Sequence, residues 1–177
     1  MGDLSNILLI TSSGLVGGNI LSVLDKRGIK AGESYYPATD KPQGLPVDIT
    51  DAASVNALFE SVKPSIVIQA AALTNVEFCQ DNRDAAWKIN VTGTLNVAKA
   101  CAAYKAKHVF FSSDYVFDGQ AGPYSETDTP HPISVYGESK LAAEEVIRET
   151  LEDHLIVRTT IVYGYEALGK NFCYRLI

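Results

Sequence analysis

The junction between the first apolar run and the residues after it constrains the fold of this chain more than any other feature. Residues Asn6–Ile10 (NILLI) are apolar except for the first, which is typical of a short strand buried on both faces. The run ends in the turn-forming residues Thr11–Gly14, and apolar residues at helical spacing follow over Leu15–Arg27, with Gly28 as the stop. A buried strand that leads directly into a helix predicts a parallel sheet with crossover helices.

The rest of the chain repeats this alternation. Further strands are predicted where short apolar runs occur, at Ser65–Ala72, His108–Ser112 and Leu155–Thr160. Further helices are predicted at Asp51–Val62, Asp84–Tyr104 and Val135–Glu149, and another begins at Asn171–Ile177. The Gly- and Pro-rich segment Asp114–Ser134 is predicted to be a long functional loop. The fold class is therefore α/β, a doubly wound parallel sheet with helices on both faces, which binds ligands at the carboxyl ends of its strands.

Composition excludes several classes of function. The 177 residues are 46% hydrophobic, which is too apolar for a disordered chain and suits one domain with a core. Because 21 acidic residues outnumber 15 basic ones, we expect neither nucleic acid nor an anionic membrane as a partner. No apolar run reaches the roughly 18 residues that a membrane span needs, and no signal-peptide pattern is present, so we expect a cytoplasmic protein. The three cysteines are far apart and the histidines are scattered, which predicts neither disulfides nor a metal site.

The turn after the first strand partly matches the glycine-rich fingerprint of dinucleotide-binding proteins. Gly14 and Gly17 occupy its last two glycine positions, and Thr11 replaces the first glycine. Small residues let the backbone approach a pyrophosphate, and the N-terminus of the helix presents free N–H groups to the phosphates. The alternative is an ordinary strand-to-helix turn.

Two further motifs carry catalytic chemistry. Tyr136 and Lys140 are four residues apart, which places them on one face of a helix. A lysine charge near a phenol lowers the pKa of the phenol, so Tyr136 is a candidate general acid for a carbonyl oxygen. Ser112, Ser113 and Asp114 follow the strand at His108 and are expected to reach the same crevice. The alternatives are a surface Tyr–Lys pair and a polar strand end in which Asp114 caps a turn.

Together these motifs resemble the extended short-chain dehydrogenase/reductases. The resemblance is carried by Ser112–Gly119 (SSDYVFDG), Tyr124–Glu126 (YSE), Pro132 and Tyr136–Glu144 (YGESKLAAE), and it covers nearly the whole chain. Within this family the chain is most similar to the dTDP-4-dehydrorhamnose reductases and to the regulatory subunit of methionine adenosyltransferase. The resemblance implies a Rossmann fold and an NAD(P)H-dependent reductase of a nucleotide-linked 4-keto sugar.

The resemblance also implies roles for individual residues. Tyr136 would donate the proton, Lys140 would bind the nicotinamide ribose and tune Tyr136, and Ser113 and Asp114 would face the keto group. Ser13 to Gly17 would hold the pyrophosphate, Asp48 and Ile49 the adenine, and Thr160 and Ile161 would border the nicotinamide. The full set expected at the coenzyme is Ser13, Gly14, Leu15, Val16, Gly17, Asp48, Ile49, Ala70, Ala71, Ala72, Ser112, Tyr136, Lys140, Thr160 and Ile161.

Several alternatives stay open at this stage. The coenzyme is expected to be NADPH, with NADH as the alternative, because Lys41 would suit a phosphate whereas Glu33 or Asp40 would suit a ribose hydroxyl. The reductases usually carry a tryptophan where this chain has Ile161. A catalytically silent, nucleotide-binding regulatory protein and a nucleotide-sugar epimerase are the alternative functions. Dehydratases place an acidic pair beside the serine, and Asp114 alone is not such a pair.

The end of the chain and its long helix lead to two further expectations. The family continues into a C-terminal substrate region, so residues 1–177 are expected to form the coenzyme domain and the start of that region, binding coenzyme without turning over substrate. Tyr163–Ile177 is expected to be mobile or packed against another chain. The helix at Asp84–Tyr104 is apolar on more than one face, so either neighbouring elements cover it or the protein forms a homodimer.

Overall fold

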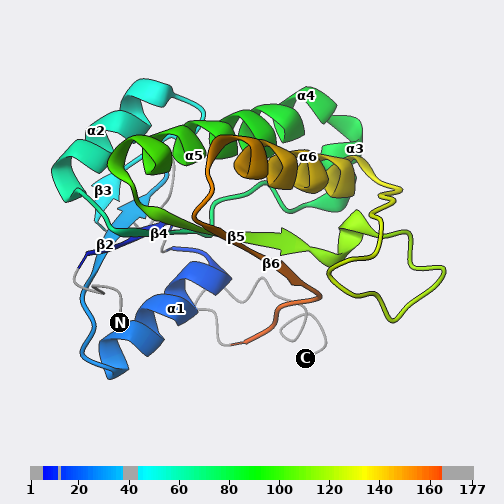
Figure 1. The fold of residues 1–177 in the computed structure, drawn as a ribbon, viewed down its shortest axis with the longest axis horizontal. Helices are drawn as coiled ribbons and strands as arrows, with labels where there is room; N and C mark the ends of the chain where they lie inside the picture. The colour runs from blue at the N-terminus through cyan, green and yellow to red at the C-terminus, as the bar shows by residue number, and fades with distance from the viewer. Residues whose placement is uncertain (1–5, 12, 38–43, 165–177) are drawn as a thin grey trace.

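A six-stranded parallel sheet forms the centre of the molecule (Figure 1). The computed structural model describes residues 6–11, 13–37 and 44–164. The strands are β1 (Ile7–Ile10), β2 (Ala31–Tyr35), β3 (Leu45–Pro46), β4 (Ile66–Gln69), β5 (Lys107–Ser113) and β6 (His154–Thr159). Their order in the sheet is β3-β2-β1-β4-β5-β6, which is the Rossmann order, and the direction of the strand order reverses between β1 and β4.

Helices cover both faces of this sheet, with α1 on one face and α2, α5 and α6 on the other (Figure 1). The helical segments are α1 (Leu15–Lys26), α2 (Ala52–Val62), α3 (Val76–Asp81), α4 (Arg83–Ala86), the π-helical η1 (Trp87–Thr92), α5 (Gly93–Tyr104), the short 3₁₀ turn η2 (Asp114–Val116) and α6 (Val135–Thr150). The predicted fold class is therefore confirmed. Among the described residues, no helix has the length and apolar character that crossing a membrane requires.

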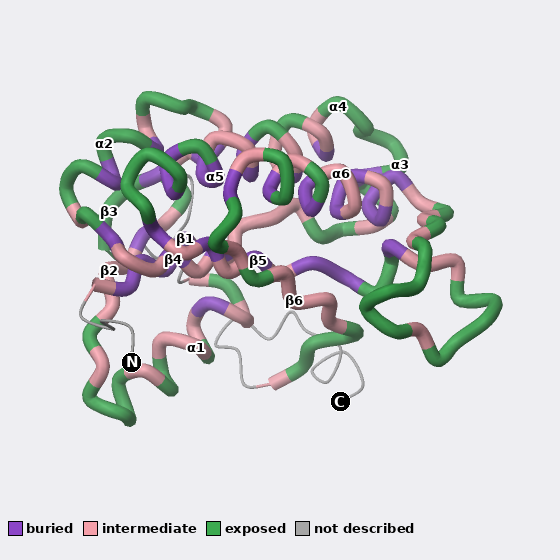
Figure 2. The backbone as a smooth tube through the Cα atoms, viewed as in Figure 1, coloured by how far each residue is buried: buried purple, intermediate pink, exposed green. Residues whose placement is uncertain are grey.

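The sequence pattern accounts for the core and for the ends of the helices. All four residues of β1 are buried, as the apolar run predicts, because the strand lies in the middle of the sheet (Figure 2). The carboxylate of Asp51 accepts the backbone N–H of Ala53 and so begins α2. The hydroxyl of Ser134 accepts the N–H of Gly137 in the same way and begins α6, which carries Tyr136 and Lys140.

Two helical segments differ from the prediction. The helix expected at Asp84–Tyr104 consists of α4, η1 and α5 in succession, and the wider turns of η1 lie in its first half. Helix α3 was not predicted, because its six residues are too few to show a helical period. The helix expected at Asn171 lies outside the described residues, as does most of Tyr163–Ile177. In the described part of this segment, Tyr163 is 67% exposed.

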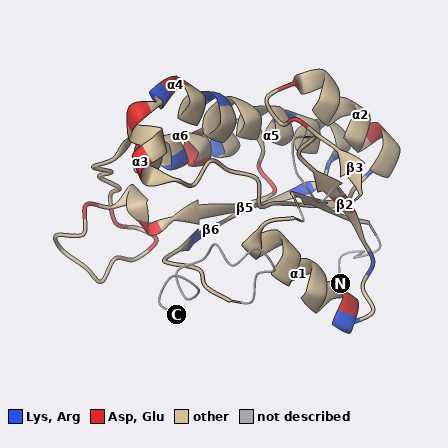
Figure 3. Ribbon diagram, turned by 180° about the vertical axis from the view of Figure 1, so that it is seen from behind, with Lys and Arg blue, Asp and Glu red and all other residues tan. Residues whose placement is uncertain are grey.

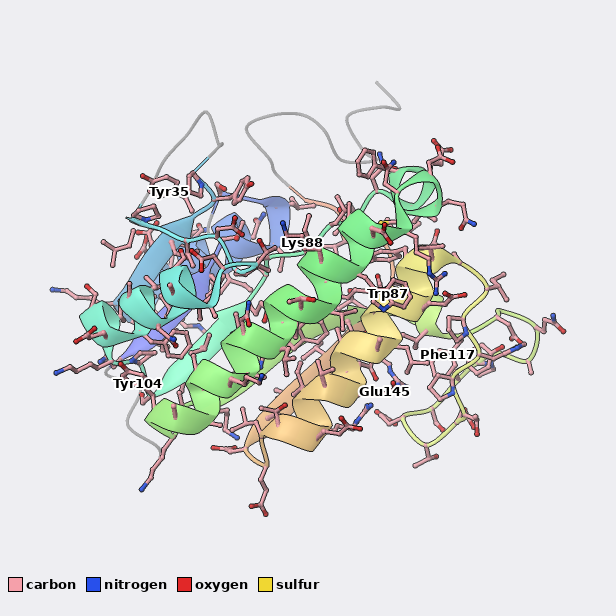
Figure 4. The ribbon with its side chains drawn as sticks, turned by 90° about the horizontal axis from the view of Figure 1, so that it is seen from above. Tyr35, Trp87, Lys88, Tyr104, Phe117 and Glu145 are labelled. Carbon is pink, nitrogen blue, oxygen red and sulfur yellow. The ribbon has the colours of Figure 1, made fainter. Side chains whose placement is uncertain are left out.

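The apolar residues in the middle of α5 are mostly buried within the chain, whereas Ala102, Ala103 and Tyr104 at its end are exposed. The helix lies between α2 and α6, as Figure 4 shows from above, and it packs on the sheet. Val97, Ala98, Ala100 and Cys101 are all buried there. Coverage by neighbouring elements therefore explains its composition without a partner, and dimerisation stays a prediction that light scattering at tens of micromolar would test.

A buried histidine in the sheet makes stability depend on pH. His108 of β5 lies with its Nε2 3.0 Å from Oε1 of Gln69 on β4. Burial, with a smaller contribution from the charge of His154, lowers the pKa of His108 to about 3. The unfolded chain has a histidine pKa of about 6.5. Between these pH values only the unfolded chain binds the proton. Lowering the pH therefore lowers the free energy of unfolding, whereas raising the pH above about 6.5 does not change this contribution.

We expect the His108→Gln variant to lose less stability than the parent protein when the pH is lowered from 7 to 5. The extra loss in the parent should be about 1.4 kcal/mol for each pH unit below about 6.5. Urea unfolding at the two pH values measures it, and the difference between the proteins cancels the titration of other groups. Equal losses in both proteins would show that His108 does not carry this dependence.

Candidate active site

Two adjoining cavities open at the carboxyl ends of the strands. The first has a volume of about 350 Å³ and lies between the end of β1, the segment after β3 and the helical turns of α4 and η1. The second has a volume of about 480 Å³ and lies between the start of α1, the end of β5, the start of α6 and the segment after β6. Thr11 and Ala72 line both cavities, so the two form one crevice. It lies where the strand order reverses, which is the usual ligand position in such sheets.

The crevice brings together nearly all of the residues that were predicted from the sequence. The first cavity is lined by Asp48, Ile49, Ala71 and Ala72. The second is lined by Gly14, Leu15, Val16, Gly17, Ala70, Ala72, Ser112, Ser113, Asp114, Tyr136, Lys140, Thr160 and Ile161. Ser13 lies in the turn before α1 but is not among the residues that line either cavity. What each residue binds stays a prediction.

The turn before α1 has the geometry of an anion site. Gly14 is the N-cap residue, and among the described residues no side chain caps this helix. A Cβ atom on Gly14 would meet nothing within 4 Å, so the space beside its backbone is open. The first helical turn, whose N–H groups have no partner within the helix and form its positive end, lies in the wall of the second cavity. Backbone N–H groups at a helix N-terminus suit a phosphate.

Thr11 explains why the fingerprint has a glycine at its first position. Its φ is 68°, in the left-handed region that glycine adopts most easily. The backbone N–H of Thr11 donates to Oγ of Ser34 at 3.2 Å, and this hydroxyl donates to the carbonyl of Leu9, also at 3.2 Å. Ser34 is buried on the neighbouring strand β2. The contact helps to hold a non-glycine residue in the conformation that the turn needs.

Tyr136 and Lys140 lie in the first turns of α6, and both are buried. Nζ of Lys140 donates to the backbone carbonyl of Phe111 at 2.6 Å and lies 4.0 Å from the ring centroid of Phe110. Burial lowers the pKa of Lys140 to about 7, and the charge of Glu144 opposes this shift. The two residues are thus on one helix face in the second cavity, as their spacing predicts, and not on the surface.

The predicted lowering of the Tyr136 pKa by Lys140 is wrong for this structure. Burial raises the pKa of Tyr136, the hydrogen bond with the Ser113 side chain opposes this, and the negative charge of Asp114 adds to the rise. The Lys140 ammonium is directed at the Phe111 carbonyl instead of the phenol. Tyr136 is therefore a neutral phenol across the physiological range, with a proton available to donate.

Ser113 and Asp114 end β5 beside Tyr136. The hydroxyl of Ser113 donates to the Asp114 carboxylate at 3.2 Å and accepts the N–H of Tyr115, also at 3.2 Å. It is Ser113, rather than Asp114, whose side chain caps the short turn η2. The ring of Tyr115 packs edge-on against that of Tyr136, with centroids 5.6 Å apart. A hydroxyl, a carboxylate and a phenol thus gather at one end of the cavity, where they can hydrogen-bond a polar substrate.

Sequence reasoning missed some residues of the crevice. Tyr36 and Lys88 line the first cavity, and Thr74 lines the second. Lys88 could have been found, because Ala85, Lys88 and Ile89 have helical spacing and all face the first cavity. Tyr36 and Thr74 lie in irregular segments, where no periodicity indicates the direction of a side chain.

Asn90 was also given no role from the sequence, although its buried side chain supports the wall of the crevice from behind. Its side-chain oxygen accepts the N–H of Leu73 at 2.8 Å, and its amide donates to the Leu73 carbonyl at 3.0 Å and to Oγ of Ser139 at 2.9 Å. It therefore ties the segment after β4 to α6. The buried position of this polar side chain in η1 could not be inferred from a helical pattern alone.

Comparisons with known proteins agree with this geometry. A sequence profile for the family described as RmlD substrate binding domain matches residues 5–177. The chain is 37% identical over 157 residues to the probable low-salt glycan biosynthesis reductase Agl14 of Haloferax volcanii, covering 86% of this chain and 52% of that protein. It is 34% identical over 124 residues to methionine adenosyltransferase 2 subunit beta of Xenopus laevis, covering 70% of this chain and 37% of that protein.

Solved structures with the same fold hold dinucleotides. The dTDP-4-dehydrorhamnose reductase of Bacillus anthracis in complex with NADP matches with a TM-score of 0.81 at 32% identity, covering 94% of this chain and 60% of that chain. The UDP-glucose 4-epimerase of Thermus thermophilus in complex with NAD matches with a TM-score of 0.79 at 29% identity, covering 89% and 56%. The chain spans about half the length of the curated relatives it matches.

Proposed function

Because this chain belongs to the RmlD substrate binding domain family, we propose that it binds NADPH along the crevice and that the whole protein reduces a nucleotide-linked 4-keto sugar. NADH is the alternative coenzyme. One observation carries the proposal: an uncapped helix N-terminus and the buried residues Ser113, Tyr136 and Lys140 line the same cavity. The sugar that we favour is dTDP-4-dehydrorhamnose, on which a structural relative of 32% identity acts by its name.

In this proposal the coenzyme spans both cavities. The adenine would lie in the first cavity beside Asp48 and Ile49, and the pyrophosphate would lie at the N-terminus of α1. The space beside Gly14 is open and can take a phosphate group, whereas a side chain at this position would fill it. Lys140 would then hold the ribose next to the nicotinamide, since its ammonium already lies in the wall of the second cavity.

The residues of the second cavity would supply the proton for the reaction. The coenzyme, when bound, supplies a hydride to the keto carbon. Tyr136 would donate its phenolic proton to the keto oxygen, and Ser113 would hydrogen-bond the same oxygen. Because burial raises the pKa of Tyr136, the phenol keeps its proton until the oxygen takes it. Asp114 would accept a hydrogen bond from a neighbouring hydroxyl of the sugar.

Two alternatives have specific support. The similarity to the methionine adenosyltransferase subunit favours a regulatory protein that binds a nucleotide without turnover. The similarity to an epimerase favours a reaction in which the coenzyme is reduced and then reoxidised. Net coenzyme oxidation separates the reductase from both alternatives, because only a reductase consumes NADPH. A small-molecule nucleotide sugar as the partner, a cytoplasmic location and a homodimer all belong to the same proposal.

The test is a reductase assay with the whole protein. NADPH and NADH are each mixed with the protein, a dTDP-4-keto sugar is added, and the nicotinamide absorbance is followed. The proposal expects the absorbance to fall at an enzymatic rate, about 1 per second or faster. Binding of NADPH with no absorbance change would exclude the reductase and leave the regulatory protein and the epimerase.

We expect Gly14→Ser to separate coenzyme binding from folding. The Cβ atom meets nothing within 4 Å and the backbone there is extended, with φ −84°, so serine fits and can cap α1. Stability to urea should stay equal or rise slightly. The affinity for NADPH should fall about tenfold or more, because the side chain occupies the space proposed for the pyrophosphate and competes for its N–H groups. Unchanged affinity would place the phosphates elsewhere.

A further inference from the structure

A fully buried carboxylate joins α6 to β6. Glu144 lies one turn beyond Lys140 on α6, and its side chain has no exposed surface. Nε of Arg158 donates to its Oε1 at 2.9 Å, and Nη2 of Arg158 donates to its Oε2 at 2.7 Å. Nη2 of Arg148 also donates to Oε2, at 2.8 Å. Acidic and basic positions accordingly lie close together along α6 (Figure 3).

The two arginines differ in what else they reach. Arg148 is in the last turns of α6, and 45% of its side chain is exposed. Arg158 is on β6, only 17% of its side chain is exposed, and its guanidinium lies 5.1 Å from the ring centroid of Phe117. Phe117 belongs to the long loop after β5 and lies beside α6 in Figure 4. Arg158 therefore contacts both the helix that carries Tyr136 and the loop that follows Ser113 and Asp114.

The contact with Phe117 continues into the loop. The rings of Phe117 and Tyr124 are stacked, with centroids 4.3 Å apart and planes 2° from parallel. The Tyr124 hydroxyl donates to Oδ1 of Asp118 at 2.5 Å, which closes this part of the loop on itself. The hydrogen bond with Glu144 raises the pKa of Arg158, and the charge of Glu126, farther along the loop, makes a smaller contribution in the same direction. One guanidinium thus contacts a carboxylate in α6 and an aromatic stack in the loop.

We propose that Arg158 is a positioning residue that fixes residues 117–133 against α6 and thereby sets the substrate side of the second cavity. The loop connects η2, which contains Asp114 and Tyr115, to α6, which carries Tyr136, and all three residues line this cavity. A displacement of the loop would therefore move groups at both ends of the substrate position. The inference rests on the proposed function for what the cavity binds, but the effect on the loop does not depend on it.

A lysine could not replace Arg158 in this role. The planar guanidinium binds both oxygens of Glu144 at once while it lies near the Phe117 ring, whereas an ammonium is a point charge. We expect Arg158→Lys to raise the hydrogen-exchange rate of backbone amides in residues 117–133 about tenfold. Arg148→Lys is the matched control, because it also loses a hydrogen bond to Glu144 but keeps the contact of Arg158 with Phe117. Its loop exchange should stay within about twofold.

A second variant distinguishes a local effect on the loop from a general loss of stability. Phe117→Leu removes the ring and leaves the buried ion pair intact, and it should raise loop exchange about as much as Arg158→Lys. Amides of β1 and β4 report global opening and should not change in this variant. Loop exchange that is unchanged in both Arg158→Lys and Phe117→Leu, or that rises equally in Arg148→Lys, would overturn the positioning role.

The kinetic readout compares the change in KM for the keto sugar with the change in the dissociation constant of NADPH. In the whole protein, Arg158→Lys should raise KM for the keto sugar about tenfold while the dissociation constant of NADPH stays within about twofold. A coenzyme affinity that falls as much as KM rises would contradict the assignment. If the parent protein turns over no keto sugar but loop exchange responds as described, the proposed function fails and the positioning of the loop by Arg158 stands.

Discussion

Replacing Tyr136 with phenylalanine is expected to lower reductase turnover by on the order of 10²-fold or more, while the affinity for NADPH changes little. The variant keeps the buried ring and its edge-on contact with Tyr115 but removes the proton donor. Steady-state kinetics of the whole protein with a dTDP-4-keto sugar measure the turnover, and titration with NADPH measures the affinity.

The matched control for this variant is Tyr104→Phe. Tyr104 ends α5, where its ring packs on Phe59 and its side chain is partly exposed, so the same hydroxyl is lost without touching the crevice. Its turnover should match that of the parent protein. A Tyr136→Phe protein with full activity would refute the role of this residue as the acid.

Lys140→Met should differ from Tyr136→Phe in affecting the coenzyme as well. The ammonium is proposed to hold the nicotinamide ribose, so its loss should lower both the affinity for NADPH and the turnover. The methionine fills a similar volume in the buried position, so the fold should persist, as a thermal melt would show. Normal coenzyme affinity in this variant would place the ribose away from Lys140.

Gly137→Ala is expected to be the most damaging of the glycine substitutions in the catalytic region. A Cβ atom at this position would lie 2.1 Å from the backbone oxygen of Tyr115 and 3.1 Å from Cβ of Pro132. Neither neighbour is the end of a flexible side chain, so α6 and the segment at Tyr115 must separate. Such overpacking costs about 1–3 kcal/mol of stability or more, and it would also shift Tyr136 relative to Ser113.

Urea unfolding compares this variant with Gly122→Ala. At Gly122 the nearest atoms to a Cβ are 3.7 Å away in the Tyr124 ring, which is ordinary contact, so that control should keep its stability. Equal stability of the two variants would show that the close approach of α6 to Tyr115 is relaxed in solution.

The sequence predicts the fold class well because each long element has its own period. The apolar run of β1 and the helical spacing of α1, α2 and α6 are local signals, and parallel strands leave few ways to connect them. The catalytic residues could be predicted because they follow these elements directly: Ser113 ends β5, and Tyr136 and Lys140 begin α6. The carboxyl ends of parallel strands meet at one edge of a sheet, which brings such residues together.

Other features depend on tertiary contacts that no local pattern contains. The spacing of Tyr136 and Lys140 suggests that the ammonium lowers the pKa of the phenol, yet burial dominates and the Phe111 carbonyl takes the ammonium. Thr11 breaks the glycine fingerprint, and only the hydrogen bond with Ser34 on the next strand shows how it is accommodated. The contacts of Arg158 with Glu144 and Phe117 join residues from three separate elements.

The measurement that tests the central claim most directly is isothermal titration of the 177-residue chain with NADPH and with NADH. The adjoining cavities at the carboxyl ends of the strands, the second of which is lined by the uncapped start of α1 and by Lys140, predict saturable binding of at least one coenzyme. Gly14→Ser should weaken that binding, whereas Arg148→Lys should not. The absence of binding heat for both coenzymes at millimolar concentration would contradict the proposal that this crevice holds a nicotinamide dinucleotide.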